Sequence, residues 1–246
     1  MLNIVIPAAG LGSRFSKVGY ENPKPFIDVA GEEMIVRVIK NLAISKAKYI
    51  VILQKKHADK FKNTLEKIKK DFNVKFVLVD GLTEGTACTV LEAADLLKDN
   101  DELLIANSDQ IVDFDLASFI NDANKRNLDG SILTFEDLEK NPKWSFVEIE
   151  NGLVLKVREK EPISTHASVG IYYFKKSKYF KTATINMINA NDRVNNEFYT
   201  APTYNYLIQE GKRIGIFKIN KEQMHGIGTP EDLNYYLYKY LNKENI

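Results

Sequence analysis

Two hydrophobic patterns alternate along the first half of the chain. Near-continuous apolar runs of strand length, typical of strands that are covered on both faces, lie at residues 4–6, 49–53, 74–79 and 103–106. Between these runs, apolar residues recur at helical spacing in residues 34–42, 61–72 and 90–97. This alternation predicts βαβ units and a largely parallel sheet.

The pattern changes from about Gly130. Strand-like runs now follow one another at residues 131–135, 146–149, 153–157 and 167–174, and a further run at 213–219 comes after two helical stretches. Asn151-Gly152, which separates the second and third of these runs, is a strong signal for a type I′ hairpin turn. The two patterns together predict an α/β fold. We expect a three-layer α/β/α sandwich whose doubly wound mixed sheet is mostly parallel and gains antiparallel strands in its second half.

Composition limits the organisation and the partners of the chain. There is no internal repeat, low-complexity tract or Pro/Gly/Ser-rich linker, so we predict a single domain over residues 1–246. The 34 Lys and Arg residues balance 33 Asp and Glu residues, which argues against binding of nucleic acid or of a membrane surface. Cys88 is the only cysteine, which excludes an internal disulfide and fits a reducing compartment.

The first residues carry no sign of a secretory signal. Met1-Leu2-Asn3 is followed by an apolar stretch that is shorter than the core of a signal peptide, and it lacks a basic segment. No apolar run in the sequence approaches membrane-spanning length. We therefore expect a cytoplasmic location.

A loop of small residues after the first strand carries the most specific chemistry. Residues 7–15 (PAAGLGSRF) allow backbone N–H groups to approach phosphate oxygens, and Arg14 and Lys24 add positive charge where a triphosphate would lie. A P-loop would need Gly-Lys-Ser/Thr at its end, and a dinucleotide-binding loop would need glycine where Phe15 stands. The alternative is a tight turn with a surface arginine.

Two further segments follow strands of the predicted parallel sheet. Residues 107–110 (NSDQ) end the fourth strand, where open α/β sheets place their ligands, and the Asp109 carboxylate suits a hard cation such as Mg²⁺ bridging to phosphate. The alternative is that Asp109 caps a turn or a helix. Gly85 and Thr86 open a helix after the third strand, and they are placed either to bond a base edge or simply to begin that helix.

The chain resembles the sugar-phosphate nucleotidyltransferases, also called nucleotide-sugar pyrophosphorylases. The resemblance covers nearly the whole chain and rests on AAGLGSR at 8–14, PKPF at 23–26, VAGEEMI at 29–35, EGTA at 84–87, NSDQ at 107–110, REK at 158–160 and GIGTPEDL at 226–233. It implies the nucleotide-diphospho-sugar transferase fold, which is Rossmann-like and GT-A-like. Residues 1–128 would form the nucleotide-binding half and residues 129–246 the acceptor-binding half.

The resemblance implies a role for each matching residue. Arg14 and Lys24 would be catalytic, stabilising charge around the α-phosphorus and the departing pyrophosphate, and Asp109 would bind Mg²⁺. The residues implied in nucleotide binding are Ala8, Ala9, Gly10, Leu11, Gly12, Ser13, Asp80, Gly85 and Thr86. Those implied in acceptor binding are Asn107, Glu159, Lys160 and Glu197. Trp144, Tyr199, Tyr204 and Tyr206 are candidates for the pocket wall or, alternatively, for the core.

Two positions depart from the family's pattern. Asp80 stands where relatives that bind uracil or thymine place glutamine, and an ionised carboxylate only accepts hydrogen bonds, which favours cytosine or guanine. The alternative is that Asp80 is a plain turn residue. Gly226 stands where relatives carry a second metal-binding aspartate, so either Asp109 suffices, or a nearby His225 or Asp113 substitutes, or metal dependence is altered.

We therefore expect an enzyme that transfers NMP from an NTP, with CTP as first choice, to a sugar phosphate or polyol phosphate. The products would be an NDP-derivative and pyrophosphate, used in surface (capsular) polysaccharide biosynthesis. The alternatives are a GTP-, UTP- or dTTP-dependent sugar-1-phosphate nucleotidyltransferase, a glycosyltransferase on the same fold, and a non-catalytic sensor of nucleotide or sugar phosphate. A homo-oligomer is compatible with the sequence.

Overall fold

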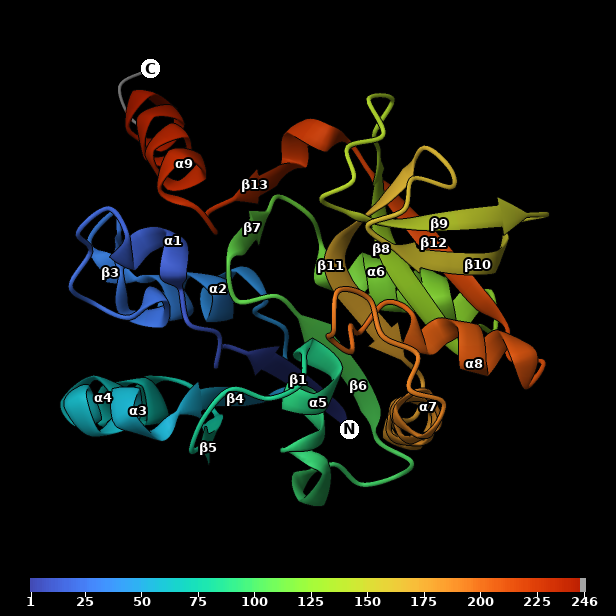
Figure 1. Cartoon of the computed structure of the whole chain (residues 1–246), viewed down its shortest axis with the longest axis horizontal. Coiled ribbons are helices and arrows are strands. Elements are labelled where there is room, and N and C mark those ends of the chain that lie inside the picture. Colours follow the sequence, from blue (N-terminus) through green and yellow to red (C-terminus); the bar gives the residue numbers. More distant parts are fainter. Residues whose placement is uncertain (244–246) are drawn as a thin grey trace.

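The structure is a computed structural model, and it describes the backbone of residues 1–243 and the side chains as far as Lys239. Within these residues, nine strands form one mixed sheet in the order β10-β9-β11-β6-β1-β4-β5, with β8 paired to β11 and β12 paired to β8 (Figure 1). Their bounds are β1 (Leu2–Pro7), β4 (Lys48–Gln54), β5 (Val74–Val79), β6 (Glu102–Ala106), β8 (Gly130–Glu136), β9 (Ser145–Glu150), β10 (Leu153–Glu159), β11 (His166–Phe174) and β12 (Ile214–Ile219).

The first half of the chain forms the parallel part of this sheet. Strand β1 pairs in parallel with β4 and β6, and β4 pairs in parallel with β5. Parallel neighbours need crossover connections, and helices supply them. These helices are α2 (Met34–Asn41), α3 (Lys55–Lys60), α4 (Lys62–Asp71) and α5 (Thr86–Leu91). The helical pattern predicted for residues 90–97 ends early, because a 3-10 turn, η2 (Ala94–Leu96), follows α5.

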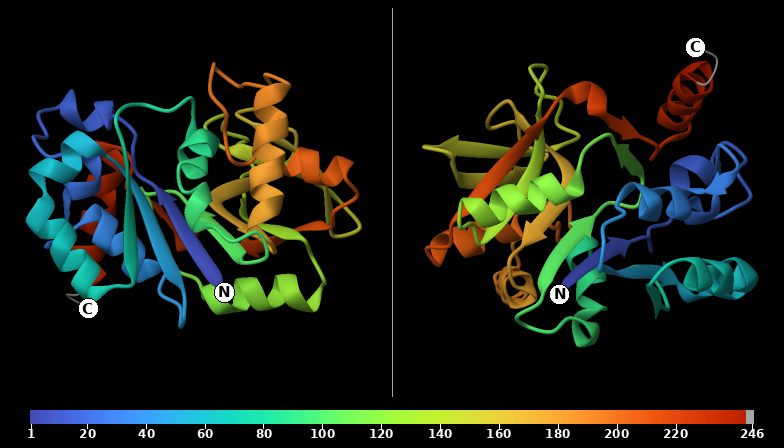
Figure 2. Two further views of the ribbon diagram at one scale, coloured as in Figure 1. Left: turned by 90° about the horizontal axis from the view of Figure 1, so that it is seen from below. Right: turned by 180° about the vertical axis from the view of Figure 1, so that it is seen from behind.

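Helices cover both faces of the sheet (Figure 2). Side chains alternate along β1, so that Ile4 and Ile6 pack in one core and Val5 packs in the other. The first core receives α2, α4 and α6 (Leu116–Lys125), and the second receives α5, α7 (Ser177–Asn189) and α8 (Thr203–Gln209). This arrangement confirms the predicted three-layer α/β/α class.

Strand β11 joins the two halves of the sheet. It pairs antiparallel with β6, β8 and β9, and β9 forms a hairpin with β10. Asn151 and Gly152, in the turn of that hairpin, have φ of 50° and 77°, as a type I′ turn requires. Strand β12 differs from the antiparallel additions because it pairs in parallel with β8. The single-domain assignment remains a prediction, and its last residues, 244–246, lie outside the described part.

Short elements place loops at the carboxyl ends of β1 and β6. They are α1 (Ser13–Ser16), η1 (Lys24–Phe26), β2 (Asp28–Val29), β3 (Glu32–Glu33), β7 (Gln110–Val112), η3 (Lys221–Gln223) and β13 (Met224–Gly226), and the long helix α9 (Pro230–Lys243) follows them. Strand β13 pairs antiparallel with β7, which brings the segment before α9 beside the end of β6.

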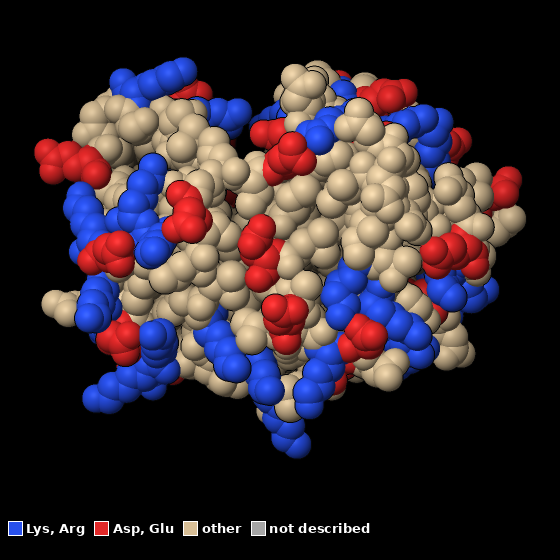
Figure 3. Space-filling view, turned by 60° about the horizontal axis from the view of Figure 1, so that its bottom comes forward, with Lys and Arg blue, Asp and Glu red and all other residues tan. Residues whose placement is uncertain are grey.

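Two surface properties follow from the described residues. No helix among them is both long and apolar enough to cross a membrane. On the face shown in Figure 3, uncharged residues cover most of the surface, and Lys and Arg side chains are interspersed with Asp and Glu side chains, in keeping with the near-neutral composition.

Candidate active site

Two adjoining pockets lie at the carboxyl ends of β1 and β6. The first, here called the loop pocket, is bounded by the small-residue loop after β1 and by residues 82–86; the second, the sheet pocket, lies over β6 and β11. Thr86, Asn107 and Asp109 line both. Each has a volume of about 280 Å³, close to the lower bound for small-ligand sites of roughly 300 Å³. The site therefore consists of two adjoining spaces, each near the lower size limit of a small-ligand pocket.

The small-residue loop forms one wall of the loop pocket. Ala8, Ala9, Gly10 and Gly12 line it. Gly12 has φ of 63°, and a Cβ there would stand only 2.9 Å from the Lys24 Cβ, so glycine lets Lys24 pack closely against the loop. Two residues predicted to bind nucleotide, Leu11 and Ser13, are exposed and line neither pocket.

The two predicted catalytic cations lie in different pockets. Lys24 lines the loop pocket and Arg14 lines the sheet pocket. The Lys24 ammonium forms an ion pair with the Asp109 carboxylate, and their side chains are 19% and 31% exposed. Arg14 has no ion pair or hydrogen bond within the described part of the chain, so its guanidinium is available to an anion.

Asp109 is held from a second side by the segment before α9. Its backbone carbonyl accepts a hydrogen bond from the Ile227 N–H (2.9 Å). A Cβ on Gly228 would stand 2.5 Å from Asp109 Oδ2, so only glycine leaves the carboxylate room at this point. Asp109 thus sits between Lys24 and the Gly228 backbone, facing both pockets.

The helix start at Gly85-Thr86 is bonded to a loop more than 100 residues away. Gly85 has φ of 126° and packs against the Phe198 backbone. The Phe198 N–H donates to the Glu84 carbonyl (2.8 Å), and the Phe198 carbonyl accepts from the Ala87 N–H (3.0 Å). This contact carries Glu197 into the lining of the loop pocket. Glu197, predicted for the acceptor, therefore lines the loop pocket, close enough to the sheet pocket for its charge to act on Glu159.

Glu159 is where the sequence places it, in the sheet pocket at the end of β10. The Ser145 hydroxyl donates a hydrogen bond to its carboxylate. Burial raises the pKa of the Glu159 carboxyl, and the nearby Glu197 charge acts in the same direction, while the Ser145 hydrogen bond and Lys160 oppose it. Glu159 is therefore a half-buried acceptor of hydrogen bonds whose charge is partly balanced.

Lys160 does not line either pocket. Its ammonium hydrogen-bonds to the Tyr199 hydroxyl (2.5 Å) and lies 4.4 Å from the centre of that ring. Lys143 lines the sheet pocket instead, with its ammonium 4.5 Å from the centre of the Trp144 ring. The sequence motif that singled out Lys160 gave no signal for Lys143, which belongs to the loop between β8 and β9.

The aromatic candidates divide between wall and core. Trp144 and Tyr199 line the sheet pocket. Tyr204 is fully buried and stacks on Phe174 with ring centres 4.5 Å apart, so it belongs to the core. Tyr206 lies outside the pocket lining and bonds Asp192 (3.2 Å).

Asp80 lies outside the pocket lining. Its side chain is 92% exposed and stands 3.7 Å from the Lys55 ammonium. Leu82 and Thr83 from the same segment line the loop pocket. The structure therefore does not bring Asp80 together with the other residues predicted to bind nucleotide.

Gly226 stands at the position of the expected second aspartate, and a different carboxylate, that of Asp232, lies beside it. Gly226 has no left-handed φ, and a Cβ there would meet Asp232 Oδ2 at 3.6 Å, an ordinary contact. Asp232, on α9, lines the sheet pocket. His225 and Asp113 pair with each other (2.8 Å) and line neither pocket of the site. Sequence reasoning missed Asp232 because Thr229 and Asp232, three residues apart, form an ordinary helix cap.

The fold and this pair of pockets agree with what the chain is similar to. The chain belongs to the nucleotidyl transferase family, whose model matches residues 3–242. This confirms the resemblance seen in the motifs.

Two curated relatives and one solved structure illustrate the family. The bifunctional protein GlmU of Methanocaldococcus jannaschii is 29% identical over 253 residues, covering 99% of this chain and 56% of that protein. The mannose-1-phosphate guanylyltransferase catalytic subunit beta of Dictyostelium discoideum is 26% identical over 178 residues, covering 70% of this chain and 49% of that protein. This chain thus spans about half the length of these relatives. The crystal structure of the nucleoside-diphosphate-sugar pyrophosphorylase from Vibrio cholerae RC9 superposes with a TM-score of 0.82 at 25% identity, covering 96% of this chain and 99% of that one.

Proposed function

We propose that this protein transfers a nucleotidyl group from a nucleoside triphosphate to the phosphate of a sugar phosphate or polyol phosphate, with release of pyrophosphate. One observation carries the proposal. Asn107 and Asp109 line both pockets, and Lys24 pairs with Asp109 at their junction. Two phosphorylated ligands, one in each pocket, would meet at this ion pair. The names of the relatives, which include guanylyltransferases and a pyrophosphorylase, support the same chemistry.

The reaction needs no covalent intermediate on the protein. An acceptor phosphate oxygen is already an anion at neutral pH, and it would attack the α-phosphorus in line as pyrophosphate leaves. The protein's task is then to hold two polyanions together and to stabilise charge on the leaving group. Lys24 would act from the loop pocket and Arg14 from the sheet pocket.

The residues of the site fit a magnesium ion that is bound jointly by the protein and by the phosphates of a substrate. Within the described residues no group of three or more His, Cys, Asp or Glu side chains is arranged to hold a metal ion. Magnesium is usually bound by one or two carboxylates and by substrate phosphates, so a single carboxylate at the junction suffices. We propose Asp109 as that ligand; the sheet pocket is also lined by the carboxylates of Glu159 and Asp232. The ion would neutralise phosphate charge as pyrophosphate leaves.

CTP is the nucleotide we propose first. The Asp80 carboxylate can only accept hydrogen bonds, and it can select the base only if the segment before Leu82 brings it from its exposed position to the rim of the loop pocket. An Asp80→Asn variant tests this directly, with Lys55→Met as its control, because Lys55 is the partner of Asp80. Loss of CTP preference in Asp80→Asn alone supports the role. An unchanged preference assigns base selection to other groups.

The product would be an activated donor of a sugar or polyol group, so a transferase must consume it. We propose that this transferase acts in surface polysaccharide synthesis. The decisive experiment is a pyrophosphate-release screen with Mg²⁺ in which CTP, GTP, UTP and dTTP are each paired with sugar and polyol phosphates. Release that depends on both substrates supports the proposal. Nucleotide binding without release indicates a sensor. Transfer of sugar from a nucleotide sugar indicates a glycosyltransferase.

A further inference from the structure

Asp137 is a buried carboxylate that the proposed reaction does not use. It follows β8 and is fully buried. One carboxylate oxygen accepts a hydrogen bond from the Asn141 N–H (2.8 Å), and the other pairs with the Lys221 ammonium (3.1 Å). Such a pair adds little net stability, because taking the carboxylate out of water offsets the attraction. Stability alone therefore does not account for the pair, and the geometry that it fixes is the other candidate.

The pair joins two segments that both line the sheet pocket. Asp137 begins the loop between β8 and β9 (residues 137–144), and Lys221 lies in η3, immediately before β13. Lys221 also stands 3.9 Å from Glu139, two residues further along the same loop. The lining of the sheet pocket comes from both segments: Lys143 and Trp144 of the loop, and Met224 and Gly226 of β13. A single lysine thus links the two segments.

Hydrogen bonds inside the 137–144 loop run from Asp137 to the pocket. The Asp137 carboxylate holds the Asn141 N–H, and the Asn141 side-chain oxygen in turn accepts from the Lys143 N–H (3.1 Å). The Asn141 carbonyl accepts from the Trp144 N–H (3.3 Å). Between them, Lys140 takes a left-handed φ of 53°, so the loop has a defined bend. A displacement of Asp137 would therefore be passed on to Lys143 and Trp144.

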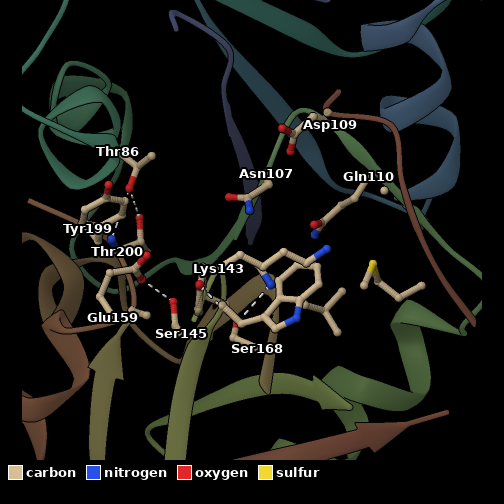
Figure 4. A pocket seen from close by; sticks show the side chains of 18 of the residues that line it. Thr86, Asn107, Asp109, Gln110, Lys143, Ser145, Glu159, Ser168, Tyr199 and Thr200 are labelled. Carbon is tan, nitrogen blue, oxygen red and sulfur yellow. Dashed lines mark hydrogen bonds between the residues drawn. The ribbon is translucent and has the colours of Figure 1, made fainter. Parts of the chain in front are cut away.

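Lys143 is the cation that the 137–144 loop brings to the pocket. The Lys160 ammonium is held by the Tyr199 hydroxyl, whereas the Lys143 ammonium lies 4.5 Å from the centre of the Trp144 ring. Figure 4 shows Lys143 among the side chains that line the pocket. An ammonium group meets an anion as a point charge, so its effect depends on where the side chain is placed. The position of the loop therefore bears on the binding of an anionic acceptor.

We propose that Asp137 and Lys221 are a positioning pair: they hold the 137–144 loop so that Lys143 and Trp144 face the acceptor. Neither member of the pair lines the sheet pocket, so both act through the loop. The proposal rests on the proposed function in one respect, since it takes the sheet pocket as the acceptor site. The position of the loop itself is independent of that assignment.

The first test needs no substrate, because Trp144 is the only tryptophan of the chain. Its fluorescence therefore reports the 137–144 loop alone. Lys221→Met keeps most of the length of the side chain and removes the ammonium, and Lys218→Met, at an exposed position on β12, is the matched control. In Lys221→Met, the Trp144 emission should shift to longer wavelength, and acrylamide should quench it more strongly. Lys221→Arg and Lys218→Met should match the wild type.

The second test separates positioning from a general structural effect. The acceptor is whichever of glucose 1-phosphate, mannose 1-phosphate, glycerol 3-phosphate and ribitol 5-phosphate supports the fastest pyrophosphate release. Lys221→Met should raise the KM for this acceptor about tenfold, with kcat and the KM for nucleotide unchanged, and Lys221→Arg should restore it. In a Lys143→Met background, Lys221→Met should have no further effect, because the side chain that the pair positions is already gone.

Asp137→Asn tests the other member of the pair. It keeps an oxygen for the Asn141 N–H and removes the charge, so it should reproduce the changes in fluorescence and in acceptor KM that are expected for Lys221→Met. If Asp137→Asn does not fold, Lys221→Met decides, because Lys221 is half-exposed and its replacement leaves the buried side chain in place.

Three results would overturn the positioning pair. They are Trp144 fluorescence that is the same in Lys221→Met and the wild type, an unchanged acceptor KM in Lys221→Met, and a KM that Lys221→Met raises by the same factor with and without Lys143. If none of the four phosphates supports pyrophosphate release, the proposed function fails, and the fluorescence measurement still decides for or against the pair.

Discussion

The Lys24 ammonium and the Asp109 carboxylate, 85 residues apart in the chain, form an ion pair where the loop pocket and the sheet pocket meet. Lys24 is carried by the short helix η1 and packs against Gly12, while Asp109 follows β6. The pair fixes a cation and an anion at the point where the two ligands would react. Its integrity is the feature on which the proposed chemistry depends most.

Removing the cation should affect turnover far more than folding. In Lys24→Ala, kcat for pyrophosphate release should fall by about 100-fold or more, because charge on the leaving group is no longer stabilised. The ion pair is partly exposed, so the free energy of unfolding should change by no more than about 1 kcal/mol. Steady-state kinetics and chemical denaturation measure the two effects. Lys17→Ala, at an exposed position that ends α1, is the control.

Arg14 is expected to serve the acceptor. It lines the sheet pocket and has no protein partner among the described residues, so Arg14→Ala should raise the KM for the acceptor phosphate and lower kcat without loss of stability. Arg14→Lys should recover only part of the activity, because lysine lacks the planar fork of donors. Acceptor kinetics that match the wild type in Arg14→Ala would remove Arg14 from the site.

Two neighbouring glycines provide a matched pair of variants. A Cβ on Gly228 would stand 2.5 Å from Asp109 Oδ2, whereas a Cβ on Gly226 would have its nearest neighbour at 3.6 Å. Gly228→Ala should therefore displace the carboxylate and lower kcat/KM by about 10- to 100-fold, and Gly226→Ala should stay close to wild type. Equal activities of the two variants would show that the position of Asp109 does not limit the reaction.

The buried carboxyl of Glu159 predicts a pH dependence. Burial raises its pKa above the ordinary value of 4.5. A raised pKa in the folded protein contributes stability that is present below pH 4.5 and is lost as pH rises through the folded pKa. The free energy of unfolding of Glu159→Gln, taken relative to that of the wild type, should therefore increase as pH rises through the raised pKa. The difference between the two proteins should be smallest below pH 4.5. Denaturation curves across this range test the sign.

The same titration should appear in acceptor binding. The ionised carboxylate is the stronger acceptor of hydrogen bonds from hydroxyl groups, so the KM for the acceptor should fall as pH rises through the raised pKa of Glu159. In Glu159→Gln this limb of the profile should be missing. A profile shared by the variant and the wild type would assign the titration to another group.

Local patterns predicted the fold well because strands and turns are determined largely by residues that are close together in the sequence. The hydrophobic runs located all nine strands of the main sheet, and Asn151-Gly152 identified the β9–β10 hairpin. The parallel pairing of β12 with β8 was not predicted. It joins residues about 80 positions apart, and the sequence of neither strand indicates which strand it will pair with.

The site was predictable where a motif includes the backbone that shapes the pocket, as at Gly12 and Asp109. It was not predictable where contacts between distant residues decide which side chain reaches the pocket. Lys160 is held by Tyr199, 39 residues later, which leaves Lys143 in the lining.

Two phosphorylated ligands are proposed to react at the Lys24–Asp109 pair. The most direct measurement is the stoichiometry of products when wild-type protein, Mg²⁺, one nucleoside triphosphate and one sugar or polyol phosphate are combined. We expect pyrophosphate and a nucleoside diphosphate derivative in a one-to-one ratio, with both products almost abolished in Lys24→Ala. Pyrophosphate formed without the acceptor, or undiminished product from Lys24→Ala, would contradict it.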